Sequence, residues 1–225
     1  MTMTIPILSK LFRGISPEDG ARLMNELGAS LRRIPKGRYV LREGDLKRNI
    51  GILLDGRLEM FETDPDGRRS MVGVVHPPES FALVFAFAAV ERHPASVLAS
   101  DDSTILVIPV DRILPQPGTE IDPVRRRFIR NILAETSEQA WELRSRAFIL
   151  SRRSTSERLL TYLRQQMRSQ GSASFSIPFD RQGLADFLCV DRSALSSVLG
   201  RLAKRGLLAY HKNSFVLKGA AGGME

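Results

Sequence analysis

Apolar and polar positions in the first half of the chain alternate over short distances, a pattern that predicts β-strands. Stretches of three to six residues are separated by turn signals, among them Gly37, Asp55-Gly56 and the segment 64–67. The stretches expected to form strands are Tyr39–Leu41, Ile50–Leu54, Leu58–Glu62, Met71–Val75, Ser96–Ala99 and Thr104–Pro109. Many short strands at fairly regular spacing predict an antiparallel sandwich, roll or barrel, preceded here by a short amphipathic helix at Ile15–Ala29.

A helical period replaces this pattern after a Pro- and Gly-containing break at residues 115–118. We expect one long helix from about Asp122 to Leu150, with Pro123 in its first turn. Along it, apolar and small residues recur at alternating spacings of four and three, the heptad pattern of a coiled coil. These residues are Ile129, Leu133, Thr136, Ala140, Leu143, Ala147 and Leu150. The pattern fits either packing on the chain's own domain or a homodimer interface, and we favour the interface because the helix separates two dissimilar domains.

The last third of the chain predicts a helix-turn-helix followed by a β-hairpin. The segments before it are a helix at Ser154–Met167 and a loop at Ser169–Ser176. Asp180 and Asp191 are placed to cap two helices, which run to about Leu188 and Lys204. Such a pair needs apolar residues where the helices cross and a small residue at the closest approach. The residues in these positions are Leu184, Ala185, Leu188, Val190, Leu195 and Val198. Residues 207–210 and 215–217, joined by a turn, would form a two-stranded wing.

The positive charge of the chain is concentrated in this last third. Residues 152–225 hold 12 Lys and Arg against 5 Asp and Glu, which gives +7, whereas residues 1–151 hold 21 against 20, which gives +1. A solvated basic surface would produce the same count, but cationic side chains also release counterions from the phosphates of nucleic acid. Together with the helix-turn-helix pattern and the wing, the charge favours a DNA-binding domain over a small helical bundle with incidental arginines.

The candidate DNA-binding residues lie at the start of the first helix of the pair, along the second helix and in the turn of the wing. A recognition helix presents its outward-facing side chains to base edges in the major groove, and cations around it meet phosphates. The candidates are Arg181, Gln182, Asp191, Arg192, Ser193, Ser196, Ser197, Arg201, Lys204 and Lys212. We assign Arg192 to a base edge because it stands at the N-terminal end of the recognition helix, and Lys204 and Lys212 to phosphates.

Several other kinds of protein are excluded by what the sequence lacks. The single cysteine, Cys189, leaves no disulfide framework and no iron–sulfur or cysteine-based zinc site, and it fits either a structural or a redox role. Three scattered histidines cannot build the metal site of a β-barrel enzyme, and no nucleophile–base pair, P-loop or dinucleotide motif is present. We therefore expect a protein that is not an enzyme and uses no metal or cofactor. With no secretory signal and no membrane-spanning run, we expect it to be cytoplasmic.

Two stretches of the chain carry a resemblance to a known family: “IPFDRQGLADFLCVDRSALSSVLGRLAKRGLLAYHKNSFVL” near the C-terminus and “VLREGD…GILLDGRLEMF…DGRRSMVGVVHPPESF” in the strand-rich half. They resemble the family of the cyclic-AMP receptor protein and FNR, the Crp/Fnr transcription regulators. The resemblance runs from about Leu8 to Leu217. It implies an α+β fold in three parts: a cyclic-nucleotide-binding-like β-roll at residues 1–120, a dimerisation helix at 121–151 and a winged helix-turn-helix at 152–225.

The resemblance also locates the family's cyclic-nucleotide site, from which this sequence departs. Nucleotide binders carry a Gly-Glu pair for the ribose and an Arg-Ser or Arg-Ala pair for the phosphate, and these pairs fall on Ala82-Leu83 and His93-Pro94. Without the carboxylate and the bidentate arginine, we expect no binding of cyclic AMP in the family's mode. The effector-pocket candidates, which either line an apolar pocket or fill it, are Phe81, Leu83, Phe85, Phe87, His93 and Trp141.

From these observations we expect a sequence-specific transcription regulator of the Crp/Fnr type that binds a near-palindromic operator in double-stranded DNA as a homodimer. Two interpretations of its sensor stay open. A small-molecule effector other than cyclic AMP could gate DNA binding by favouring one arrangement of the dimer. Alternatively, the pocket is collapsed and the protein binds DNA without a ligand. RNA polymerase is a further candidate partner, and we expect no association with membranes.

Overall fold

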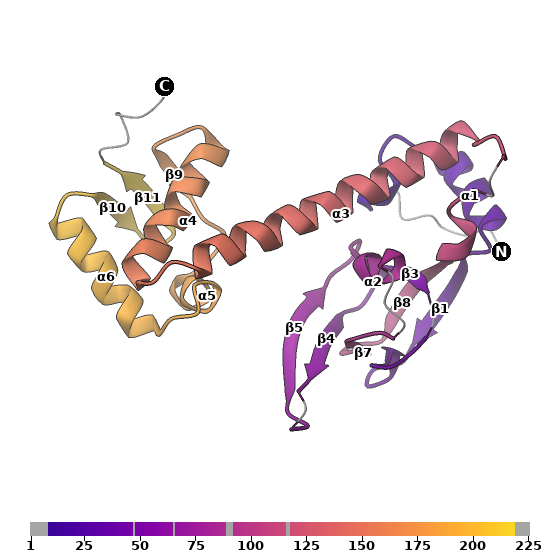
Figure 1. Cartoon of the computed structure of the whole chain (residues 1–225), viewed down its shortest axis with the longest axis horizontal. Helices are drawn as coiled ribbons and strands as arrows, with labels where there is room; N and C mark the ends of the chain where they lie inside the picture. Colours follow the sequence, from indigo (N-terminus) through magenta and orange to yellow (C-terminus); the bar gives the residue numbers. More distant parts are fainter. Residues whose placement is uncertain (1–8, 47, 65, 89–91, 116–117, 219–225) are drawn as a thin grey trace. The chain divides into compact units, whose positions relative to one another are not determined.

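The computed structural model describes residues 9–46, 48–64, 66–88, 92–115 and 118–218. The chain divides into two compact units, residues 1–139 and 140–225. The long helix α3 (Pro123–Leu150) gives its first part to unit 1 and its last part to unit 2 (Figure 1). This helix confirms the one expected from about Asp122 to Leu150. The outer limits expected for the terminal domains, residues 1 and 225, lie outside the described residues.

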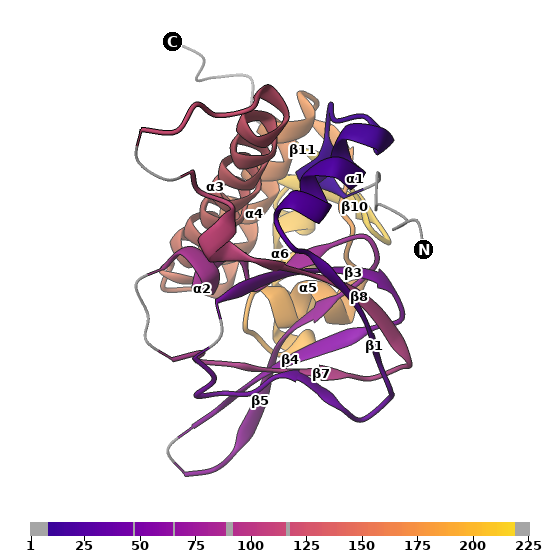
Figure 2. The same ribbon diagram turned by 90° about the vertical axis from the view of Figure 1, so that its right-hand side faces the viewer.

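Unit 1 is built on two four-stranded antiparallel sheets, shown in Figure 2. The order in the first sheet is β1 (Ser30–Ile34), β8 (Ser103–Pro109), β3 (Asn49–Asp55) and β6 (Ser80–Phe81). The order in the second is β2 (Tyr39–Leu41), β7 (Ser96–Ala99), β4 (Leu58–Thr63) and β5 (Arg69–Val75). All six predicted strands are present, and the expected β-roll is confirmed.

Helical segments cover the outer face of the first sheet. They are the 3-10 turns Lys10–Phe12 and Val110–Arg112, α1 (Pro17–Glu26), α2 (Leu83–Phe87) and the start of α3. The helix expected at Ile15–Ala29 is therefore shorter, because the Ser16 side chain accepts a hydrogen bond from the backbone N–H of Asp19 and fixes where α1 begins.

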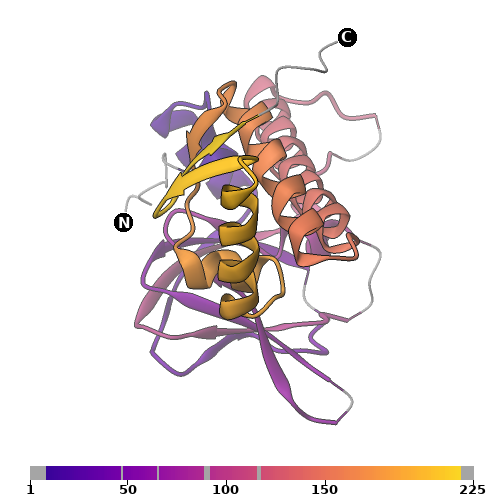
Figure 3. The same cartoon turned by 90° about the vertical axis from the view of Figure 1, so that its left-hand side faces the viewer.

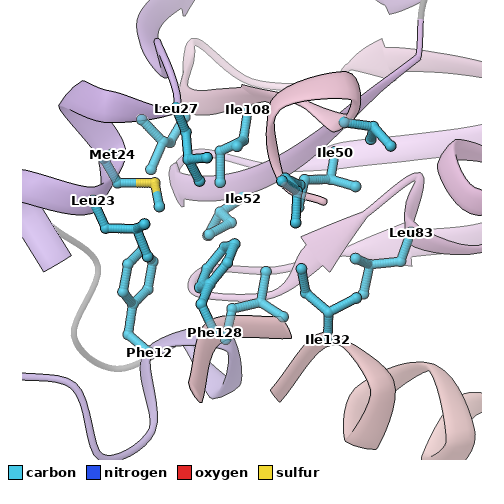
Figure 4. Close-up of a cluster of buried hydrophobic side chains, with 14 of the residues drawn as sticks. Phe12, Leu23, Met24, Leu27, Ile50, Ile52, Leu83, Ile108, Phe128 and Ile132 are labelled. Carbon is cyan, nitrogen blue, oxygen red and sulfur yellow. The ribbon is translucent and has the colours of Figure 1, made fainter. Parts of the chain in front are cut away.

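The central strands of the first sheet, β3 and β8, are buried on both faces, which explains why they appear as nearly continuous apolar runs in the sequence. In β3, Ile50 and Ile52 pack on the outer cluster with α1, α2 and α3, whereas Leu53 packs on the cluster between the two sheets. Figure 4 shows the outer cluster, in which Phe128 of α3 lies close to Ile52. The Phe128 side chain is fully buried, which stabilises unit 1 by roughly 1.5–3 kcal/mol.

Unit 2 contains the rest of the helices and a small sheet. Its elements are α4 (Thr155–Gln170), α5 (Arg181–Phe187), α6 (Arg192–Lys204) and the strands β9 (Ser174–Ser176), β10 (Leu208–His211) and β11 (Ser214–Leu217). Ser154 and Glu157 form a reciprocal capping box at the start of α4. The winged helix-turn-helix is confirmed, with one correction: the segment expected as a loop at Ser169–Ser176 contains β9, which pairs with β11 and adds a third strand to the wing.

Candidate nucleic-acid interface

The helix α6 separates an apolar face from a polar one. Leu195, Val198, Leu199 and Leu202 follow the spacing of one helix face, and all four are buried in the core of unit 2. Asp191 occupies the N-cap position, but its side chain makes no capping hydrogen bond. The prediction that the Asp191 carboxylate caps the helix is therefore wrong, because the capping hydrogen bond is not formed. The prediction that α6 begins after Asp191 is confirmed.

The turn between α5 and α6 closes through a Schellman motif. The backbone N–H of Val190 donates to the carbonyl of Ala185, and that of Cys189 donates to the carbonyl of Asp186. Cys189 takes the left-handed conformation that this motif requires, with φ at 53°, a position where glycine costs less strain. At the other end of α5, Asp180 caps the helix as expected, since its carboxylate accepts from the backbone N–H of Gly183 at 2.7 Å.

The candidate side chains of α6 are exposed on the helix face opposite the core. They are Arg192, Ser193, Ser196, Ser197, Arg201 and Lys204. Figure 3 shows the helix itself at the front of unit 2. The Ser196 hydroxyl donates to the carbonyl of Arg192 at 2.9 Å, so its oxygen remains only as an acceptor toward a partner. Asp191 is also exposed, at the very start of this face.

Three further candidates lie around the start of α5 and the wing. Arg181 donates to the carbonyl of Lys212 at 3.4 Å, and its guanidinium lies 5.1 Å from the centre of the Tyr210 ring. These contacts bring Arg181 and Lys212 together from distant parts of the sequence. Gln182 instead donates to the Asp186 carboxylate at 2.8 Å. Lys212 forms the tip of the wing with φ at 51°, and its side chain is exposed.

Sequence reasoning missed Arg158, a partly buried residue of α4. Its guanidinium donates to the carbonyls of Arg152, Leu188 and Cys189 at 3.0, 3.1 and 3.3 Å. Two of these acceptors lie about thirty residues further along the chain, in the turn before α6. No local pattern signals such a contact, because an arginine on a helix ordinarily predicts a solvated side chain.

The predicted heptad residues of α3 differ in their exposure. Leu133 and Leu143 are 62% and 65% exposed, and Ala140 and Ala147 are exposed as well. Ile129, Thr136 and Leu150 are partly buried. The apolar residues of α3 that are buried in unit 1, Phe128 and Ile132, lie outside the heptad set. Much of the heptad set is therefore exposed to solvent in the described part of the chain.

Where the resemblance places the family's ribose contact, unit 1 has a left-handed backbone and buried apolar side chains. Ala82, where the resemblance places glycine, still has a left-handed backbone with φ at 64°. Leu83 is 2% exposed and belongs to the outer core cluster, while Phe81 is 5% exposed and belongs to the cluster between the sheets. The Phe81 ring lies so close to Gly51 that a Cβ there would meet its carbon atoms.

The other sensor candidates lie in different environments. His93 is buried, its ring packs edge-on against Phe85 with centroids 5.2 Å apart, and its Nδ1 has no hydrogen-bond partner among the described residues. Burial lowers the pKa of His93, with a smaller opposite effect from Asp45. Phe87 is 37% exposed. Trp141 belongs to unit 2 and is 64% exposed, and the Arg144 guanidinium lies 5.5 Å from its ring.

A buried carboxyl group in unit 1 was also missed. Glu135 of α3 is 8% exposed, and its Oε1 lies 2.5 Å from the Ser80 hydroxyl, which donates to it. In the part of the chain that the structure describes, its Oε2 has no hydrogen-bond partner. Burial raises the pKa of Glu135, against the lowering effects of the Ser80 hydrogen bond and Lys10. The sequence gives little indication that Glu135 is buried, because a glutamate next to a heptad position on a helix is ordinarily solvated.

Within the described ranges, no helix is both long and apolar enough to span a membrane. The same part of the chain holds no group of three or more His, Cys, Asp and Glu side chains that could bind a metal ion.

Two family profiles match the chain, one in each half. Residues 31–115 match the cyclic nucleotide-binding domain, and residues 157–221 match the Crp-like helix-turn-helix domain. The first match covers the β-roll strands and the second covers α5, α6 and the wing.

Curated proteins that are similar over most of this chain include transcription regulators. The transcriptional activator protein Anr of Pseudomonas protegens is 23% identical over 83% of this chain and 75% of its own length. The cyclic AMP receptor protein of Thermus thermophilus is 24% identical over 95% of this chain and 94% of its own. Among solved structures, the c-di-GMP responsive regulator CLP of Xanthomonas campestris has a TM-score of 0.51 at 19% identity, with 88% and 97% of the two chains covered, a likeness of fold.

Proposed function

Because the chain belongs to the Crp/Fnr family of DNA-binding transcription regulators, we propose that it binds a near-palindromic operator as a homodimer in the cytoplasm, through α6 and the wing of each subunit. The observation that carries this proposal is the polar face of α6, which is exposed while its opposite face is buried. The proposed division of the chain is a sensor at 1–120, a dimerisation helix at 121–151 and a DNA-binding domain at 152–225.

Arg192 is the proposed base-reading residue. It is exposed at the first position of α6, the end of a recognition helix that enters the major groove. A guanidinium can donate two parallel hydrogen bonds to the O6 and N7 atoms of guanine. Ser193, Ser196 and Ser197 are too short for that fork and would make shorter-range contacts.

Phosphate contacts are proposed for the cations around this helix. Lys204 lies at the end of α6, and Lys212 at the tip of the wing. Arg181, held against the wing by its bond to the Lys212 carbonyl, would reach the backbone on the same side. These contacts position the protein without reading sequence.

A homodimer would present two copies of α6 to one face of the duplex, about 34 Å apart. The exposed heptad residues of α3, Leu133, Ala140, Leu143 and Ala147, support this assembly because pairing would remove their apolar surface from water. If the regulator activates transcription, it would also contact RNA polymerase.

A binding titration tests the DNA-reading assignment. The probes are a duplex selected by the wild-type protein from a randomised pool and a scrambled duplex of the same composition. Arg192→Ala should weaken binding to the selected duplex by about 1–3 kcal/mol and leave the scrambled duplex nearly unchanged. Lys212→Ala should weaken both duplexes alike and reduce the slope of log K against log salt by about one.

The control for charge is Arg164→Ala on α4, which should leave both titrations unchanged. If Arg192→Ala weakens both duplexes equally, Arg192 contacts a phosphate and the base-reading assignment is wrong. If neither Arg192→Ala nor Lys212→Ala alters binding at any salt concentration, α6 does not enter the major groove.

For the sensor we propose that a small molecule other than cyclic AMP gates DNA binding. The second candidate is a regulator whose sensor site is collapsed, and one observation favours it. The burial of Phe81 and Leu83 in the two cores of unit 1 supports a collapsed site and a regulator that binds DNA without a ligand. A thermal-shift panel of metabolites separates the two, since an effector stabilises the folded protein and raises its melting midpoint. No shift from any compound would favour the collapsed site.

A further inference from the structure

The Arg158 side chain joins three segments of unit 2 that are separate in the sequence. Its Nε donates to the carbonyl of Arg152, in the link between α3 and α4, at 3.0 Å. Its Nη1 donates to the carbonyls of Leu188 and Cys189, at the end of α5 and in the following turn, at 3.1 and 3.3 Å. One planar cation therefore connects the α3–α4 link to the turn that precedes α6.

Among the described residues, no other group donates a hydrogen bond to the three carbonyls that Arg158 reaches. The last turn of a helix leaves backbone carbonyls free, and the Schellman motif here uses those of Ala185 and Asp186, not that of Leu188. Cys189 holds a left-handed backbone without being glycine, a conformation that persists only where the surroundings enforce it. A guanidinium bonded to both Leu188 and Cys189 supplies that constraint and also suits the negative end of α5.

The α3–α4 link is itself held to α3. The Arg152 side chain donates to the carbonyl of Phe148 at 3.4 Å, and its guanidinium lies 4.1 Å from the centre of the Phe148 ring. Ile149 is buried in the core of unit 2. A continuous set of contacts therefore runs from the last turn of α3 through Arg152 and Arg158 to the turn before α6.

We propose that Arg158 is a positioning residue for DNA recognition: it fixes the α5–α6 turn to the end of α3 and thereby sets the orientation in which α6 meets the duplex. This inference rests on the proposed DNA-binding role of α6. Arg158 is partly buried and three of its five N–H donors are used by backbone carbonyls, so we assign it a role through α6 and not a contact with DNA.

Arg158→Lys is the appropriate variant because it keeps the charge and the aliphatic stem but loses the planar fork. A lysine ammonium is a point donor and cannot reach the α3–α4 link and the turn together. Arg164→Lys is the matched control, since Arg164 lies on the same helix, is exposed and has no hydrogen bond or ion pair among the described residues. Both variants are made in the full-length chain.

The measurements are binding of the selected and scrambled duplexes across a salt series, well below the melting midpoint of each variant. We expect Arg158→Lys to weaken binding to the selected duplex about tenfold and to leave the salt slope unchanged. This factor corresponds to the loss of roughly one charge-assisted hydrogen bond that orients α6. Arg164→Lys should bind like the wild type. Amide exchange at Cys189 and Val190 should become faster in Arg158→Lys, while exchange at Leu199 inside α6 stays the same.

Two results would overturn the proposal. If Arg158→Lys melts lower but binds both duplexes as tightly as the wild type, Arg158 only stabilises the fold. If it weakens both duplexes equally and reduces the salt slope, Arg158 contacts a phosphate directly. A wild-type protein that does not prefer the selected duplex would overturn the proposed function as well, which distinguishes that failure from a failure confined to Arg158.

Discussion

Units 1 and 2 each hold a non-glycine residue in the left-handed region at a helix end, Ala82 before α2 and Cys189 after α5. Such a residue costs about 1–2 kcal/mol in each case. Beside Ala82, the position of the family's ribose contact is filled by Leu83, which belongs to the core. Beside Cys189, the turn leads into α6, whose polar face is open to solvent.

This difference shows that a binding-site fold can persist while the side chains that would bind the ligand change. Unit 1 matches the profile of the nucleotide-binding domain, but Leu83 and His93 stand where the resemblance places the glutamate and arginine contacts. Unit 2 retains both its backbone and an accessible polar face. A family profile matches each unit, so membership of the family alone does not tell which of the two sites still binds its ligand.

The largest effect is expected from α3, which the two units share. Leu133→Glu combined with Leu143→Glu should give monomers, because two exposed apolar heptad positions would become charged. Losing the second half of a two-site contact should weaken operator binding by about 10²–10⁴-fold. Light scattering gives the mass, and the selected duplex gives the affinity.

Glu142→Gln, on the same helix but outside the heptad set, serves as the control and should remain a dimer. An unchanged dimer mass in the double variant would show that the dimer interface lies elsewhere. The exposed heptad face of α3 would then not be the dimerisation surface.

Because Leu83 is buried and the polar face of α6 is exposed, substitutions at these two places should differ in their effect on the free energy of unfolding. Leu83→Ala should lower the free energy of unfolding by about 2–5 kcal/mol, because it empties a core position. Ser197→Ala on the exposed face of α6 should change it by no more than about 0.5 kcal/mol while altering operator affinity. Urea unfolding measures both. A cost below about 1 kcal/mol for Leu83→Ala would mean that the site is loosely packed and has room for an effector.

A smaller effect concerns pH. Burial lowers the pKa of His93 below 6.5, so the unfolded chain binds a proton there in a range where the folded chain does not. The free energy of unfolding should therefore fall as the pH falls from about 7 to 5, by up to about 1.4 kcal/mol per pH unit from this group. Urea unfolding of His93→Gln should show a weaker pH dependence than the wild type.

His76→Gln is the control, because His76 is exposed in the same unit. Glu135 acts with the opposite sign, since burial raises its pKa and the folded chain holds its proton above pH 4.5. Glu135 is present in the wild type, in His93→Gln and in His76→Gln, so a difference in pH dependence between these proteins isolates the effect of His93. Equal pH dependence in the wild type and His93→Gln would contradict the buried, neutral state of this histidine.

Elements with strong apolar periodicity were predictable, and elements defined by tertiary pairing were not. β1 has mostly exposed side chains and is a strand because it pairs with β8. β9 contains one apolar residue, Phe175, between two serines, and its pairing with β11 makes it a strand. α2 lies in an apolar run whose periodicity cannot distinguish a short helix from a strand.

The candidate sites were predictable to a similar extent. The exposed positions of α6 follow from helix periodicity, since the buried leucines fix the opposite face. The role of Arg158 does not, because its acceptors are backbone carbonyls in a turn that only the folded chain brings near α4. Whether Leu83 lines a pocket or fills it was equally beyond the sequence, because both require the same apolar residue.

The most direct test of the account is a fluorescence-anisotropy titration of the full-length protein on its selected duplex, with and without cyclic AMP. The account predicts salt-dependent binding that is tighter than for a scrambled duplex and identical in the presence and absence of the nucleotide. Binding that appears only when cyclic AMP is added would contradict it, and would mean that unit 1 recognises the nucleotide through residues other than those at Leu83 and His93.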